Sequence, residues 1–195
     1  MKRTVLLLGA TALLGGCSLG LSGKAPPFFL TLTPEARPSA NAGVQLQPGD
    51  ALTINVPLVP QAIATTRLPV AQGQTAIAFL KDAVWVEPPA RLFQRLLAET
   101  VRARTGRVVL DPRQFNMDPG ATLSGQLLRF DIEEKGARAI VVYDATISGE
   151  KGRPVRSRRF EARVAAGRID AEGAGDALNR AANNVAGQVA DWLAN

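Results

Sequence analysis

The most reactive side chain in this sequence is its single cysteine, Cys17, and the 195 residues include no histidine. One cysteine cannot form a disulfide within the chain, and without histidine the usual Cys/His zinc sites are excluded. A catalytic base would have to be Asp, Glu, Lys or Tyr, because the side chain that most often takes this role is missing. The residue types therefore favour a protein that is not an enzyme and needs no cofactor, and they direct attention to Cys17.

Cys17 ends a segment with the three parts of a secretory signal. Lys2 and Arg3 precede a mostly apolar run at 4–14, and two glycines separate that run from the cysteine. The run is shorter than the roughly 20 residues that cross a membrane. The stretch 14–17 resembles the lipobox of bacterial lipoproteins, in which the signal is cut before the cysteine and the thiol and the new α-amine are acylated, so that several acyl chains hold the protein stably. The alternative is an ordinary signal peptide with a chance cysteine.

These features divide the chain into three parts. Residues 1–16 are predicted to be a signal peptide, 17–27 the lipidated cysteine and its tether, and 28–195 the folded domain. The tether is rich in Gly, Ser and Pro, and ten extended residues reach at most about 33–36 Å. The residue after the cysteine is Ser18. An Asp at that position would resemble the enterobacterial signal for retention in the inner membrane, and this sequence has no Asp there. By that resemblance we expect a lipid anchor in the outer membrane, with the domain on the periplasmic face.

Paired carboxylates are the remaining catalytic possibility, because two acids about 5–10 Å apart can hydrolyse a glycosidic bond. Nothing in their spacing indicates such a pair, and solvation on the surface is the simpler interpretation. The sequence also lacks a phosphate-binding Gly-rich loop and a Gly-x-Ser-x-Gly motif. The scattered acids are Asp82, Glu87, Asp111, Asp118, Asp131, Glu133, Glu134 and Asp144.

The most specific charge pattern is a basic run in which Glu161 is the only acid. Such a run could meet lipid headgroups or an acidic partner. In the alternative interpretation it is a solvated hairpin, whose charge discourages pairing at a strand edge. The net charge of +6 and the few aromatic residues make nucleic acid an improbable ligand. The run contains Lys151, Arg153, Arg156, Arg158, Arg159, Arg163 and Arg168, of which Arg156, Arg158 and Arg159 are the candidates for binding a partner.

Three aromatic residues are further candidates for binding a partner. Trp85 precedes the first predicted helix, and we expect it to pack between that helix and the sheet. A place at a partner surface is the alternative, since Trp is enriched in interface hot spots. Phe28 and Phe29 come directly after the tether, so they could pair into the sheet or touch a partner or lipid.

Periodicity predicts the elements that position these residues. Two amphipathic helices are indicated at 89–104 and 175–193, the first with prolines at its start and a glycine after its end. Segments 121–133, 137–148 and 155–165 have the pattern of an antiparallel meander. A parity break in the first of these strands indicates a bulge or burial on both sides, and the second should be central because it is apolar on both faces.

Shorter segments complete the predicted fold. A single helical turn is indicated within 60–66. The predicted class is α+β, a two-layer domain in which two main helices pack on one face of a mixed or antiparallel sheet. The shorter predicted strands are 28–32, 51–56, 67–72, 76–80 and 107–110.

Several stretches carry a resemblance to a known family. After the lipobox come FFLTLTP at 28–34, INVPLVP at 54–60 and WVEPPARLFQRLL at 85–97, and LSGQL at 123–127 adds weaker support. With these motifs the sequence resembles the ABC-type transport auxiliary lipoprotein component family, the PqiC-like lipoproteins. Residues 62–70 depart from the family pattern, because they are rich in Ala and Thr and contain a proline.

The resemblance implies a function and a set of partners. Such lipoproteins are outer-membrane partners of MCE-domain substrate-binding proteins, whose inner-membrane permease and ATPase complete an intermembrane lipid transporter. The implied fold is an α/β sandwich, the implied assembly can be a ring of copies, and no catalytic residues carry over. The alternative is a structural or accessory lipoprotein of another envelope assembly machine.

Overall fold

The computed structural model describes residues 26–38, 51–110, 120–149 and 152–195. The predicted signal peptide, Cys17 and most of the tether lie outside the described residues, as do Asp111, Asp118 and Lys151. The order of elements is β1 (Leu52–Ile54), a 3-10 helix (Gln61–Ile63), β2 (Arg67–Gln72), β3 (Ala76–Val84), α1 (Pro89–Thr105), β4 (Val109–Leu110), β5 (Ala121–Glu133), β6 (Arg138–Ser148), β7 (Arg156–Ala165) and α2 (Ala171–Ala194).

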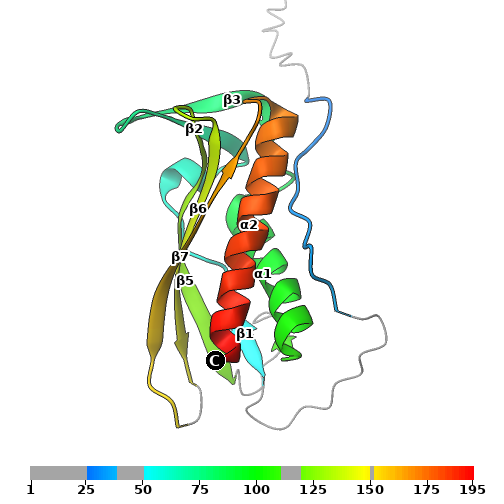
Figure 1. Cartoon of the computed structure of the whole chain (residues 1–195), viewed down its shortest axis with the longest axis vertical. Helices are drawn as coiled ribbons and strands as arrows, with labels where there is room; N and C mark the ends of the chain where they lie inside the picture. Colours follow the sequence, from blue (N-terminus) through cyan, green and yellow to red (C-terminus); the bar gives the residue numbers. More distant parts are fainter. Residues whose placement is uncertain (1–25, 39–50, 111–119, 150–151) are drawn as a thin grey trace, which may run out of the picture.

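The strands form one mixed sheet of seven strands, with both helices on one of its faces (Figure 1). The α+β class and the two-layer arrangement predicted from the sequence are confirmed. Strands β5, β6 and β7 form the predicted antiparallel meander, with β6 in the middle. Along its other edge β5 pairs in parallel with β1 and β2, while β3 pairs antiparallel to β2 and β4 parallel to β1.

The parity break predicted in β5 is a β-bulge. The register with β6 shifts between Leu127 and Arg129, so that Leu128 has no cross-strand partner. Before the bulge, odd-numbered residues such as Leu123 point to the helices, and after it Phe130 and Ile132 do so. The bulge thus turns a different set of polar residues outward in each half of the strand.

The two helices cover the inner face through apolar stripes. Helix α1 begins at Pro89 and ends before Gly106, whose φ of +68° suits the left-handed cap of a helix. Helix α2 begins at Ala171, four residues earlier than predicted. The reason is Asp170, whose carboxylate accepts a hydrogen bond from the Gly173 N–H (2.8 Å) and caps the helix.

The prediction of a strand at 28–32 is wrong. Only Leu30 pairs, in a single parallel bridge to Trp85 just past the end of β3. The Leu30 N–H donates to the Val84 carbonyl, and the Val86 N–H donates to the Leu30 carbonyl, each at 2.8 Å. The apolar run is long enough for a strand, but only one of its residues lies beside the edge of the sheet. The residues after Leu30 bond to α2 instead.

From Leu30 onward the chain lies along α2, as Figure 1 shows for the blue segment beside the helix. We call residues 30–35 the N-terminal strap. The backbone N–H groups of Thr33 and Glu35 donate to the side-chain oxygens of Asn179 and Asn183, both at 2.8 Å. The Asn183 amide also donates to the Thr33 carbonyl at 2.9 Å. The strap therefore runs in the direction of α2, from its start toward its C-terminal half.

Three of the other predicted strands differ from the observed ones at their ends. Strand β3 continues to Val84 rather than stopping at residue 80, and a bulge in its pairing with β2 contains Asp82 at a φ of +59°. The predicted strand 51–56 shortens to β1, and the predicted strand 107–110 shortens to β4. Pro69 is tolerated inside β2 because it lies beside the same bulge, where the ladder is already interrupted.

Candidate functional site

Trp85 is part of the core. Its side chain is 1% exposed and meets the Phe130 ring edge-on, with the ring centroids 5.5 Å apart. The expectation that it packs between helix and sheet is confirmed. The indole is therefore not on the outer surface. The backbone of Trp85 is bridged to that of Leu30, which connects it to the exposed start of the described chain.

Phe28 and Phe29 are on the surface, 45% and 58% exposed. They directly precede Leu30, and Val86, which is 57% exposed, directly follows Trp85. Side chains alternate about a bridged pair, so Phe29 and Val86 point away from the side on which Trp85 is buried and Leu30 packs against the core. We call Phe28, Phe29 and Val86 the entry patch, because the described chain enters the domain there. The sequence analysis did not single out Val86, since nothing in its surroundings shows that a bridge sets its segment beside the one that carries Phe29.

The three candidate arginines do not form one cluster. Strand alternation places Arg156 and Arg158 on the helix side of β7 and Arg159 on the other side. The Arg156 guanidinium lies 5.1 Å from the centroid of the Trp192 ring, and that of Arg158 lies 5.3 Å from the Phe160 ring. Arg159 pairs with the carboxylate of Asp144 on β6 at 2.6 Å.

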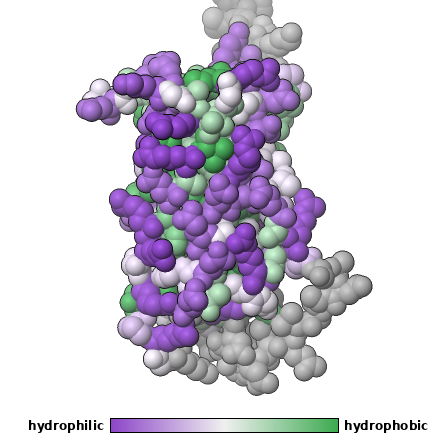
Figure 2. Space-filling view, in the orientation of Figure 1, coloured by the Kyte–Doolittle hydropathy of each residue, from purple (hydrophilic) through white to green (hydrophobic). Residues whose placement is uncertain are grey.

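The face of the sheet away from the helices is covered by ion pairs. Arg159 hydrogen-bonds to Asp144 and lowers the pKa of that carboxyl, and Arg138 does the same to Glu133. The Arg163 guanidinium pairs with Glu161. These pairs accord with the solvated-hairpin interpretation for part of the basic run. Hydrophilic side chains also predominate in the view of Figure 2, with hydrophobic ones in small groups between them.

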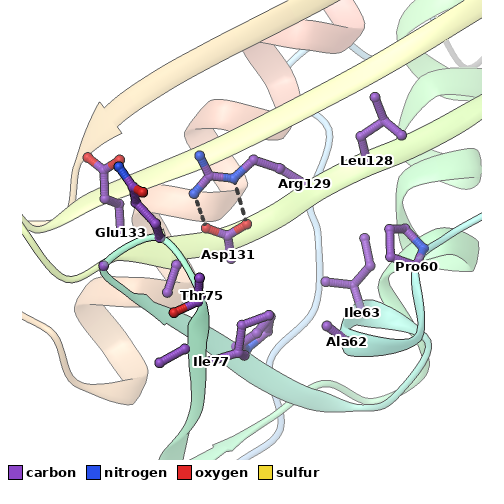
Figure 3. A pocket seen from close by; sticks show the side chains of 14 residues that line it. Pro60, Ala62, Ile63, Thr75, Ile77, Leu128, Arg129, Asp131 and Glu133 are labelled. Carbon is purple, nitrogen blue, oxygen red and sulfur yellow. Dashed lines mark hydrogen bonds and ion pairs between the residues drawn. The ribbon is translucent and has the colours of Figure 1, made fainter.

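A cavity of about 480 Å³ lies on this face, between the 3-10 helix, the β2–β3 hairpin and β5 (Figure 3). Pro60, Ile63 and Ile77 contribute apolar walls. On β5, Arg129 donates two hydrogen bonds of 2.6 and 3.0 Å to the Asp131 carboxylate, and these bonds raise the pKa of Arg129. The sequence analysis missed this cavity, because it is the bulge that turns Arg129 and Asp131, which are two residues apart on β5, to the outer face.

Asp131 and Glu133 line the same cavity, which is the arrangement that a carboxylate hydrolase requires. Both are paired with arginines, Asp131 with Arg129 and Glu133 with Arg138. A general acid needs a raised pKa, whereas Arg138 lowers that of Glu133. The two carboxylates are therefore members of ion pairs on the outer face of the sheet, and the pKa of Glu133 is shifted away from the direction that a general acid needs.

Solved structures and a family model are similar to this chain. No curated protein sequence matches it. Two crystal structures share its fold. One is of an uncharacterised protein, with a TM-score of 0.65, 14% identity and coverage of 77% of this chain and 96% of that chain. The other is of protein XCC0632 from Xanthomonas campestris, with a TM-score of 0.65, 17% identity and coverage of 86% and 95%.

A PelC dodecamer from Paraburkholderia phytofirmans aligns with a TM-score of 0.36 and 13% identity over 74% of this chain and 93% of that chain, too distant to compare assemblies. Within the described residues, neither helix is long and apolar enough to cross a membrane.

The family model for the ABC-type transport auxiliary lipoprotein component matches residues 30–190, most of the chain and nearly all of the folded domain. This chain belongs to the ABC-type transport auxiliary lipoprotein component family.

Proposed function

We propose that this protein is a lipid-anchored periplasmic accessory subunit of an MCE-type ABC lipid transport system, which it docks at the outer membrane. Membership of the family supports association with an ABC transporter. The lipobox-like stretch ending at Cys17 supports an anchor made of several acyl chains. The MCE-domain partner and the outer membrane are expectations from the resemblance of the sequence.

The observation that carries the proposal is the course of the N-terminal strap. The strap enters beside the start of α2, where Leu30 packs so closely that a Cβ on Gly175 would lie 2.7 Å from its side chain. It is then fixed to Asn179 and Asn183. An anchor preceding residue 28 therefore holds one end of an elongated domain, and the opposite end is left to reach a partner (Figure 1).

That opposite end holds the end of α2 and the start of β7, and we call it the hairpin end. Arg156 and Arg158 lie there on the helix side, and Val155 is 67% exposed beside them. Each of the two guanidinium groups lies over an aromatic ring, that of Arg156 over Trp192 and that of Arg158 over Phe160, so this end of the domain is cationic. We propose that this surface meets an acidic surface of the transport partner, where interfacial charge sets orientation and association rate.

Co-purification from detergent extracts tests the proposal. We expect the wild-type protein to recover an MCE-domain protein, and R158E to recover less of it because the charge at the hairpin end is reversed. R91E is the matched control, since Arg91 is an exposed arginine on α1. Recovery of components of another envelope assembly machine instead would favour the alternative function. Equal loss with R158E and R91E would contradict the assigned surface.

The state of the anchor and the number of copies are separate parts of the proposal. Mass spectrometry of the native protein should show a chain that begins at Cys17 and carries acyl chains, and an unmodified thiol would contradict the anchor. The family resemblance also leads us to propose that several copies assemble. Native mass spectrometry in detergent should then show a defined oligomer, and a monomer at all concentrations would refute that part alone.

A further inference from the structure

We infer that the entry patch, Phe28, Phe29 and Val86, is a membrane-contacting surface that inserts into the boundary between headgroups and acyl chains of the leaflet that holds the anchor. This inference rests on the proposed anchor at Cys17. It adds a second attachment and thereby an orientation of the domain on the membrane.

The entry patch contains three of the large apolar side chains that are exposed in the described residues. Its members are 45–58% exposed, and the bridge between Leu30 and Trp85 joins the two segments that carry them. Exposed apolar groups that lie together mark a surface that meets something less polar than water. The remaining exposed large apolar side chains are Val56, Leu58, Ile77 and Val155, and none of them adjoins the described start of the chain in sequence.

The occupant follows from the length of chain before the patch. Ten residues, 18–27, separate Cys17 from Phe28. Ten residues reach at most about 33–36 Å, whatever their conformation. The patch is thus held near the bilayer, and contact with it becomes an intramolecular event at an effective concentration on the order of millimolar. Aromatic and aliphatic side chains then partition into the interface, as on amphipathic membrane-binding helices.

The patch can orient the domain because it is rigidly attached to the fold. Two backbone hydrogen bonds of 2.8 Å fix Leu30 between Val84 and Val86, and the strap that follows is bonded to α2. If the patch lies in the interface, the start of α2 faces the membrane and the hairpin end, with Val155, points away from it (Figure 1). The acyl anchor alone would leave the domain free to rotate on its tether.

Quenching of tryptophan fluorescence by brominated lipids tests the inference on the full lipidated protein. The variants F29W and V155W are reconstituted into phosphatidylethanolamine/phosphatidylglycerol vesicles with and without brominated acyl chains. Val155 is the matched control, because it is an exposed apolar residue at the hairpin end. The native Trp85 and Trp192 contribute the same background to both variants, and the wild-type protein measures it.

We expect brominated vesicles to remove about half or more of the fluorescence that F29W adds, because a side chain at the headgroup–acyl boundary lies within reach of the acyl bromines. V155W should be unchanged. Quenching of V86W would support the same surface, while F29W and V86W both as unquenched as V155W would overturn the inference. Protein that sediments with vesicles but is unquenched refutes the patch and leaves the anchor intact. Protein that does not sediment refutes the anchor and the inference together.

Discussion

Aromatic side chains are exposed near the start of α2, whereas near its end they pack beneath arginines. At its start, Phe28 and Phe29 are exposed next to the bridge that joins the partly buried Leu30 to the buried Trp85. At its end, the rings of Phe160 and Trp192 pack against each other at 5.5 Å and are covered by arginines from β7. The same helix thus joins an apolar surface to a cationic one.

The difference indicates what each end is suited to meet. An uncovered aromatic ring gains free energy by leaving water, whereas a guanidinium over a ring keeps its charge available to solvent or to an anionic surface. A domain with one apolar and one cationic end suits a protein held at a membrane by the first and bound to a partner by the second. The predictions below test whether the two ends differ in stability, in fixation of the chain and in response to pH.

The largest difference between the ends should appear when their tryptophans are removed. W85A removes a side chain that is fully buried against Phe130, and such truncations cost about 3–5 kcal/mol of unfolding free energy. W192A removes a half-buried ring at the other end and should cost clearly less. Urea unfolding followed by circular dichroism measures both. Equal losses would show that the two ends are packed alike.

The second effect concerns the strap, which enters the domain at the end that carries the entry patch (the entry end) and then runs along α2. N183A removes the side chain that accepts from the Glu35 N–H and donates to the Thr33 carbonyl. Leaving these backbone groups without partners should cost about 1–3 kcal/mol. The neighbouring Asn184 is exposed, so N184A is the matched control.

Amide hydrogen exchange distinguishes a local effect of N183A from a global one. Glu35 should lose protection in N183A, while the central strand β6 exchanges as in the wild-type protein. If N184A has the same effect, or if Glu35 is already unprotected in the wild-type protein, the strap is not fixed as the hydrogen bonds indicate.

A smaller effect is expected when the cover of an aromatic ring at the hairpin end is removed. R158A takes away the guanidinium over Phe160 and should cost about 0.5–1 kcal/mol, the size of an exposed cation–π contact. R153A is the control for loss of charge, because Arg153 is an exposed arginine of the same basic run. Thermal unfolding at two salt concentrations measures both. Equal destabilisation by the two substitutions would mean that charge, rather than ring contact, is what Arg158 contributes.

Helices and the central meander could be predicted from the sequence because their signals are local. The stripe on α1 repeats over four turns, and β6 is apolar on both faces, so neither depends on knowing a distant partner. The segment 28–32 has an equally apolar pattern, yet only Leu30 pairs. Pattern gives the propensity of a segment to pair, whereas the length of free sheet edge depends on the whole topology.

The sites were predictable only in part for the same reason. Trp85 was expected to pack in the core, and it does. The basic run reads as one cluster in sequence, but strand alternation divides it between two faces and brings Arg159 to Asp144. Val86 joins the entry patch through a bridge between residues 55 positions apart, and a bulge turns Arg129 and Asp131 together to the outer face of the sheet. Such contacts follow from register, which sequence spacing does not contain.

The smallest effect should be a dependence of folding stability on pH, caused by ion pairs on the outer face of the sheet. Arg138 lowers the pKa of Glu133, which precedes the turn into β6 near the entry end, and Arg159 lowers that of Asp144, farther along β6. A carboxyl whose pKa is depressed on folding stabilises the protein above its unfolded pKa, and that contribution is lost as pH falls through the folded pKa. Stability should therefore decline below about pH 4, with a slightly shallower slope in E133Q and D144N than in wild type.

The loss is small because both carboxylates are partly exposed and screened by solvent. Urea midpoints from pH 6 to pH 2 measure the slope, and D176N is the control, since Asp176 is an exposed acid on α2. If E133Q alone flattens the curve, the ion pairs stabilise the entry end only. If D176N flattens it as much as the other two, acid sensitivity reflects net charge and not these pairs. Equal small shifts in E133Q and D144N would show that the two ends, so different in their aromatic surfaces, share one electrostatic face.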